Sequence, residues 1–178
     1  LVSKFDQTTM TTPAMILKAE GFRYVFGRSY SGEDIAFVYD SENPDRVYCD
    51  LNTVSMQANA NARRAIGFPS NYVFSDEASD ILRMDIGIGP KAIEIQPELV
   101  SIEESSKTFE FSSFERALLF AEDGTNDIAD IVGDDSNEKI SIYPEVSIYQ
   151  GTGYFVFVDP RIQLNYTNDS PGDDWMVF

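Results

Sequence analysis

Short runs in which apolar residues recur at every second position place the tightest limit on how this chain can fold. One such run begins after residue 21, is interrupted at 31–34 and then resumes. Its recurring side chains are Phe22, Tyr24, Phe26, Ile35, Phe37 and Tyr39. A period of two residues is typical of a β-strand with one buried face, so we expect a hairpin over residues 22–39.

Further runs of the same kind follow along the chain. We expect strands at 46–51, 81–88, 92–95, 99–103, 140–149, 154–158 and 161–166. Gly-Pro at 89–90 and Gly-Thr-Gly at 151–153 lie between neighbouring runs, where these residues favour turns over phosphate-binding loops. The sequence shows no internal repeat with a convincing period.

Two segments carry helix signals instead. In residues 52–69, Gly67 stands where a glycine often caps the end of a helix. In residues 112–124, Ser112 and Glu115 have the spacing of a capping box. The predicted fold class is therefore α+β, a mainly antiparallel β-sheet or sandwich with two short helices.

The chain has the size of one domain. Its 178 residues are 43% hydrophobic, which is enough to form a core. Residues 1–14 are rich in threonine and weakly patterned, so we expect an extended N-terminal arm. We expect a single β-rich domain over 15–170 and a C-terminal tail over 171–178.

The absence of histidine and the presence of a single cysteine, Cys49, exclude several kinds of chemistry. They exclude histidine-dependent nucleophilic catalysis, zinc sites of the Cys and His type, and an intramolecular disulfide. Cys49 lies among β-formers and is expected to be a small buried hydrophobe. We therefore expect no enzyme activity, no catalytic residues, no metal ligands and no cofactor.

The net charge of −17 limits the possible partners. A chain of this charge repels nucleic-acid phosphates and anionic lipid surfaces, so we expect neither direct nucleic-acid binding nor membrane binding. No apolar run approaches the length of a membrane span. A soluble protein is expected, and a virus particle is one location that such a protein can have.

Residues 122–138 form the most acidic segment, with seven carboxylates in seventeen residues. The segment lacks the EF-hand order of calcium ligands, and a calcium site, a solvated loop and a protein-docking surface are the alternatives. The tail ends with the only tryptophan and a terminal phenylalanine, and we expect this apolar end to pack against the domain or a neighbouring subunit. The predicted partner-binding residues are Asp123, Asp127, Asp130, Asp134, Asp135, Trp175 and Phe178.

These features together favour association over catalysis. We expect a non-enzymatic structural or interaction subunit of a larger protein assembly, such as a virus particle, whose partners are other subunits in a homo- or hetero-oligomer. One alternative is an acidic inhibitor that imitates DNA and occupies a nucleic-acid-binding protein. A second alternative is a hydrolase that depends on two carboxylates.

Overall fold

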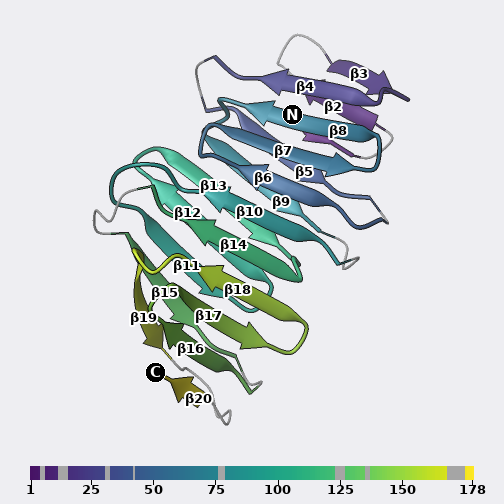
Figure 1. The fold of residues 1–178 in the computed structure, drawn as a ribbon. Coiled ribbons are helices and arrows are strands. Elements are labelled where there is room, and N and C mark those ends of the chain that lie inside the picture. Colours follow the sequence, from purple (N-terminus) through teal and green to yellow (C-terminus); the bar gives the residue numbers. More distant parts are fainter. Residues whose placement is uncertain are drawn as a thin grey trace.

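The structure is a computed structural model, and it describes residues 1–4, 7–11, 16–30, 33–41, 43–75, 79–122, 127–134, 137–167 and 175–178. These residues form two ten-stranded β-sheets, here called sheet A and sheet B, and no helix. The prediction of an α+β fold with two short helices is therefore wrong. The chain is an all-β solenoid that advances from the purple strands at one end to the yellow-green strands at the other (Figure 1).

Each sheet contains strands from the whole length of the chain. Sheet A contains, in spatial order, β19 (Gln163–Thr167), β15 (Ile128–Val132), β11 (Ala92–Gln96), β12 (Leu99–Glu104), β13 (Lys107–Ser112), β9 (Ser70–Phe74), β5 (Ile35–Tyr39), β1 (Val2–Ser3), β2 (Gln7–Thr11) and β3 (Ile16–Glu20). Sheet B contains, in the same direction, β20 (Trp175–Val177), β16 (Lys139–Tyr143), β17 (Val146–Gly151), β18 (Tyr154–Val158), β14 (Arg116–Phe120), β10 (Ile81–Asp85), β6 (Arg46–Cys49), β7 (Thr53–Ala58), β8 (Asn61–Ile66) and β4 (Tyr24–Arg28).

Five consecutive strands form one unit of the solenoid. In the second unit, residues 46–91, strands β6, β7 and β8 form an antiparallel group in sheet B, β9 crosses to sheet A, and β10 returns to pair in parallel with β6. The third unit, residues 92–138, repeats this order from β11 to β15 with the sheets exchanged. The first unit, residues 1–45, matches the third, and the fourth unit, residues 139–178, matches the second.

The four units follow one another at a nearly constant spacing. Their second strands begin at Gln7, Thr53, Leu99 and Val146, which are 46, 46 and 47 residues apart. The expectation that the chain has no internal repeat is therefore wrong. A repeat of this length is typical of a solenoid, in which each unit contacts mainly its neighbours.

Neighbouring units join through parallel strand pairs. The third strand of a unit pairs with the fourth strand of the unit before it, as β8 does with β4, β13 with β9 and β18 with β14. The fourth strand also pairs with the fifth strand of the unit before it, as β9 does with β5, β14 with β10 and β19 with β15. Every internal junction therefore uses the same two kinds of strand pair.

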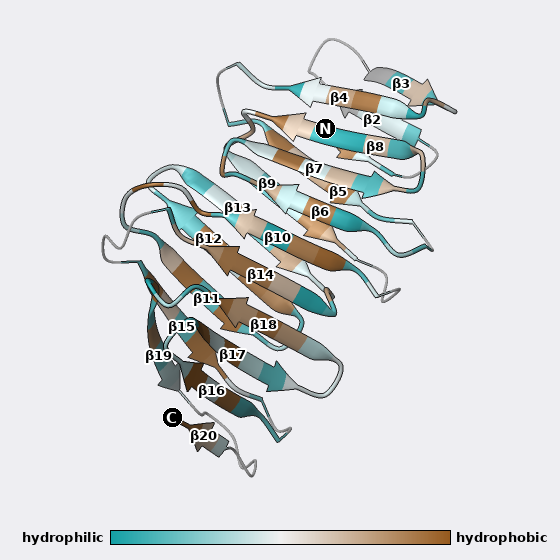
Figure 2. Cartoon of the chain, in the orientation of Figure 1, coloured by the Kyte–Doolittle hydropathy of each residue, from teal (hydrophilic) through white to brown (hydrophobic). Residues whose placement is uncertain are grey.

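The core lies between the two sheets and repeats from unit to unit. On the fifth strands, Leu82 and Met84 of β10 and Ala129 and Ile131 of β15 point inward and are at most 1% exposed. Figure 2 shows the result as hydrophobic segments, coloured brown, interrupted by hydrophilic ones along the strands. Burial of each large aliphatic side chain contributes about 1.5–3 kcal/mol to folding.

The segments 52–69 and 112–124, predicted to be helical, form strands. The first contains the hairpin of β7 and β8, and the second contains β14. Val54 and Met56 are buried two residues apart, which places them on one face of a strand but not on one face of a helix. Gly67 has a φ of 72°, the left-handed conformation of a helix cap, but here it ends a strand.

The predicted hairpins have different outcomes. β17 and β18 form the hairpin expected around Gly-Thr-Gly at 151–153, which confirms that prediction. The hairpin predicted over 22–39 is wrong, because β4 and β5 lie in different sheets. The described part of the stretch 1–14 contributes β1 and β2 to sheet A, and β20 of the tail pairs with β16.

Candidate functional site

A buried aspartate precedes the fifth strand in the second and third units. Oδ1 of Asp80 accepts a hydrogen bond from the backbone N–H of Asp45 at 2.6 Å. Oδ1 of Asp127 accepts one from the backbone N–H of Lys91 at 3.0 Å. Each carboxylate thereby fixes the start of the first strand of its unit beside the start of the fifth. Asp127, predicted to contact a partner, is 1% exposed and belongs to this scaffold.

Two other predicted partner-binding residues lie on or near β15. Asp130 is exposed, and its Oδ1 accepts a hydrogen bond from Nδ2 of Asn165 at 2.9 Å. Asp134 is half-buried, and its backbone N–H donates to Oε1 of Glu138 at 2.8 Å. Of the three acidic candidates that the structure describes, Asp127 is buried in the scaffold, whereas Asp130 is exposed and Asp134 is half-buried.

The remaining acidic candidates, Asp123 and Asp135, lie outside the described residues. Within the described ranges, no group of three or more histidine, cysteine, aspartate or glutamate side chains is placed to hold a metal ion.

Acidic side chains of the third unit form a row across the outer face of sheet A. Glu94 of β11 stands opposite Asp130 of β15 in parallel register. Two strands further along the same row, Glu110 of β13 stands opposite Ser101 of β12, the neighbour of Glu94. Like charges directly opposite one another destabilise a sheet, so Glu94 and Asp130 weaken the pairing of β11 with β15.

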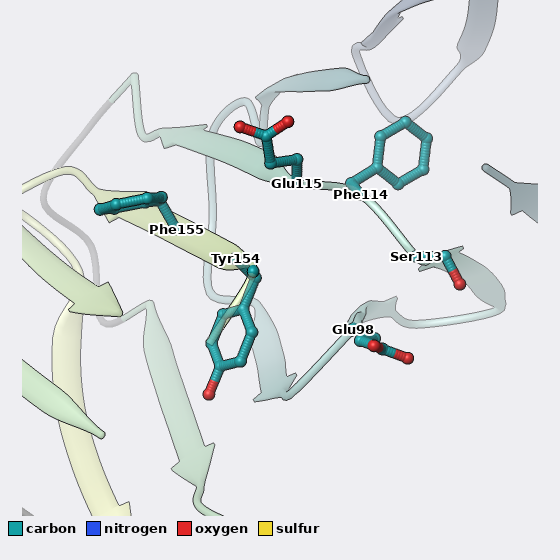
Figure 3. A pocket seen from close by; sticks show the side chains of 7 residues that line it. Glu98, Ser113, Phe114, Glu115, Tyr154 and Phe155 are labelled. Carbon is teal, nitrogen blue, oxygen red and sulfur yellow. The ribbon is translucent and has the colours of Figure 1, made fainter. Parts of the chain in front are cut away.

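A cleft of about 450 Å³ opens beside the hairpin of β17 and β18 (Figure 3). It is lined by Glu98, Ser113, Phe114, Glu115, Gly153, Tyr154 and Phe155. Glu98 is exposed, and Oε1 of Glu115 pairs with Nη2 of Arg116 at 3.3 Å. Both carboxylates are open to water, whereas a carboxyl that acts as a general acid is normally desolvated. The chain also has no histidine that could activate Ser113.

The N-terminal end of the solenoid leaves apolar side chains uncovered. β3 and β4 each pair with one described neighbour only. Phe22 is 61% exposed, whereas its counterparts Phe68 and Phe114 in the next two units are 4% and 7% exposed. On the outer face of β4, Tyr24 and Phe26 are exposed to the same extent as Phe22. A side chain that the inner units bury is therefore open to solvent here.

The C-terminal end is open in the same way. β19 and β20 are the last described strands of their sheets. Met176 and Phe178 are 47% and 87% exposed, although their counterparts Ala129 and Ile131 are almost completely buried. Trp175, on the outer face of β20, is 68% exposed. A small groove of about 90 Å³ follows this edge and is lined by Glu138, Ile140, Tyr166, Trp175 and Met176.

The two open ends form the candidate site, and the sequence-based prediction found only part of it. It included Trp175 and Phe178 but not Phe22, Tyr24 or Met176. The signal that could have revealed Phe22 is the repeat spacing. Phe22 and Phe68 lie 46 residues apart, and each follows a glycine. Without the repeat, Phe22 is indistinguishable from an ordinary core residue.

Cys49 does not belong to any site. It is completely buried on β6, and burial raises the pKa of its thiol to about 12. The thiolate, which is the reactive form, is therefore scarce at neutral pH. The prediction that Cys49 is a small buried hydrophobe is confirmed.

Among the residues that the structure describes, none belongs to a helix capable of crossing a membrane. Comparison with known proteins finds no matching family model, no similar curated protein and no similar solved structure.

Proposed function

We propose that this chain is a non-enzymatic structural subunit of a larger protein assembly, which it joins through the open ends of its two sheets. The observation that carries the proposal is the exposure of core-type side chains at these ends. Phe22 and Phe178 occupy positions that are buried in the inner units, yet they are 61% and 87% exposed. Among the described residues, these apolar side chains lie at sheet edges, and exposed apolar side chains at a sheet edge favour a further protein surface that covers them.

The cleft beside the hairpin of β17 and β18 supports the proposal, because its side chains are poorly suited to catalysis. Its two carboxylates are open to water, and one of them is held by Arg116. A carboxyl that acts as a general acid is normally desolvated, and neither of these two is buried. A structural role explains both the exposed apolar side chains at the sheet edges and the water-exposed carboxylates of the cleft, whereas a hydrolytic role explains neither.

The test is the size of the particle that contains the chain in an extract of its source cells. A tagged chain should migrate far above its own mass of 20.0 kDa. Replacing Trp175 by Glu should return most of it to the free mass, because a charge then replaces an apolar side chain at the end of sheet B. The control is Ile88→Glu, since Ile88 is 71% exposed but lies between β10 and β11. A wild-type chain that migrates at its own mass would contradict the proposal.

A further inference from the structure

We propose that the cleft beside the hairpin of β17 and β18 is a binding site for a primary alkylammonium group, carried by a lysine side chain. The cleft has a volume of about 450 Å³ and lies at the junction of the third and fourth units, beside internal strands of sheet B. At both earlier junctions, a basic side chain of the chain itself contacts the equivalent corner. The proposal goes beyond the proposed function, because it assigns a ligand to a surface away from the sheet ends.

The corner that forms one wall of the cleft has a close equivalent in the second unit. Ser113, between β13 and β14, donates its backbone N–H to the carbonyl oxygen of Glu98 at 2.7 Å. Gly67, between β8 and β9, donates to the carbonyl oxygen of Asn52 at the same distance. The φ angles of Ser113 and Gly67 are 64° and 72°. The two corners therefore have the same backbone arrangement and can be compared directly.

At the junction of the second and third units, a lysine reaches this corner. Lys107 is the first residue of β13, and its Nζ donates a hydrogen bond to the carbonyl oxygen of Leu51 at 2.9 Å. Leu51 directly precedes Asn52, the residue that is bonded to the corner glycine. The following unit thus supplies an ammonium group to the corner of the unit before it.

At the junction of the first and second units, an arginine makes the corresponding contact. Nε of Arg63, on β8, donates to the carbonyl oxygen of Lys4 at 3.1 Å, and Nη1 donates to that of Phe22 at 3.3 Å. Phe22 is the counterpart of Phe114, which lines the cleft. Both earlier junctions therefore bring a cation from the following unit onto carbonyl oxygens of the preceding one.

The junction of the third and fourth units differs in this respect. The first residue of β18, equivalent to Lys107, is Tyr154, and the counterpart of Arg63 on β18 is Val156. Tyr154 is 4% exposed, and its hydroxyl is hydrogen-bonded to that of Tyr149 at 3.0 Å, so its polar end is turned into the protein. Among the described residues that line the cleft, none is basic. The cleft therefore lies where the two earlier junctions carry a cation.

The polar groups of the cleft suit an ammonium ligand. Glu98 and Glu115 offer carboxylate oxygens, which bind an ammonium group more strongly than the carbonyl oxygens used at the earlier junctions. Arg116 pairs with Oε1 of Glu115 at 3.3 Å, but an ion pair between two such accessible side chains contributes little to stability. An incoming ammonium group can therefore rearrange this pair at small cost.

The apolar part of the lining suits the alkyl chain that carries the ammonium group. Figure 3 shows the rings of Phe114 and Phe155 on opposite sides of Glu115. Lysine side chains commonly bury their methylene stem along apolar surface while the charged end stays near water, and aromatic rings also attract a cation. The combination favours a long alkylammonium over a small inorganic cation.

The test uses the purified chain and a small probe, N-acetyl-lysine methylamide. The backbone amide signals of Ser113 and Gly153 should shift and saturate in an NMR titration, with a Kd on the order of millimolar for a single exposed charged contact. N-acetyl-norleucine methylamide is the matched probe, because it has the same stem without the ammonium group, and it should cause no saturable shift. Equal shifts from both probes would overturn the proposal.

Two variants that each remove one negative charge test the position of the site. Glu98→Gln should weaken binding of the lysine probe about threefold to tenfold, because an ionic acceptor becomes a neutral one. Glu94→Gln is the matched control, since Glu94 is equally exposed but lies on β11 outside the cleft, and it should change the Kd by less than about twofold. Equal losses in the two variants would show attraction by the net charge alone and would overturn the proposal.

A last measurement separates a lysine side chain from a free diamine as the source of the ammonium group. 1,5-Diaminopentane should bind within about tenfold of the lysine probe, because one ammonium group and its stem make the contact. Binding that is tighter than this would assign the cleft to free diamines and overturn the choice of lysine. All of these titrations use the single purified chain, so their outcome does not depend on the particle-size test of the proposed function.

Discussion

The second and third units have the same five strands in the same order, but their charges differ widely. The second unit, residues 46–91, contains five basic and five acidic residues, whereas the third, residues 92–138, contains two basic and thirteen acidic residues. Their net charges are 0 and −11. Much of the difference lies on outward positions and in loops, while the inward positions of the fifth strands stay apolar in both. The fold therefore depends on inward positions and leaves the outer face free to vary.

At one inward position, a charged side chain in the second unit stands where the third unit has an aromatic ring. Phe109 of β13 is completely buried, and its counterpart on β8 is Arg63, which is 5% exposed. Nε of Arg63 donates a hydrogen bond to the carbonyl oxygen of Lys4 at 3.1 Å, and Nη1 donates to that of Phe22 at 3.3 Å. In the second unit, hydrogen bonds to the first unit thus replace the packing of an aromatic ring.

The largest loss of stability is expected when the side chains of these two equivalent residues, Phe109 and Arg63, are truncated. Phe109→Ala should lower the free energy of unfolding by about 3–5 kcal/mol, because it leaves a cavity between the sheets. Arg63→Ala should cost less, about 1–3 kcal/mol, since water can replace part of its hydrogen bonding near the end of the solenoid. Urea denaturation of both variants measures the two values. An equal or larger loss for Arg63→Ala would show that the polar contacts carry the core here.

An intermediate effect is expected at the buried aspartates, where the two units agree. Asp80→Ala and Asp127→Ala should each cost about 1–3 kcal/mol, because a buried backbone N–H loses its acceptor. Asp130→Ala is the matched control on β15, and its cost should stay within about 0.5 kcal/mol because the side chain is exposed. Thermal unfolding of the three variants provides the comparison. Equal costs at Asp127 and Asp130 would argue against the scaffold role of the buried carboxylate.

The smallest effect is expected from the surface charge that separates the units. Glu94→Gln should raise stability by a few tenths of a kcal/mol, up to about 1, because it removes repulsion from Asp130 on the neighbouring strand. Glu110→Gln is the control, since Glu110 stands opposite Ser101 and Tyr72. Melting temperatures at low salt and at about 1 M salt measure the effect, which screening should abolish at high salt. A gain that persists in high salt would point to packing instead.

Strands were easier to predict from the sequence than their arrangement. Runs such as 92–95 and 154–158 were found because a period of two is visible within a few residues. The segment 52–69 was misread because Gly67 adopts a left-handed conformation that ends helices and strands alike. Local signals of this kind do not distinguish a hairpin within one sheet from a crossing to the other.

The repeat could have been found from a few positions. Asp34, Asp80, Asp127 and Asp174 lie 46, 47 and 47 residues apart, and each is followed by isoleucine or tryptophan. Most other positions differ between units because outward residues are not constrained by the core. The open ends could not be recognised without the repeat, since exposure of a residue such as Phe22 is unusual only beside its buried counterparts.

The exchange of sheets from each unit to the next makes the parity of the unit count matter. The first and third units place their three-stranded groups in sheet A, whereas the second and fourth place theirs in sheet B, so the arrangement repeats only after two units. At about 4.8 Å per strand, ten strands advance roughly 48 Å. Side chains on the outer face of equivalent strands therefore return to the same side of the solenoid only in every second unit.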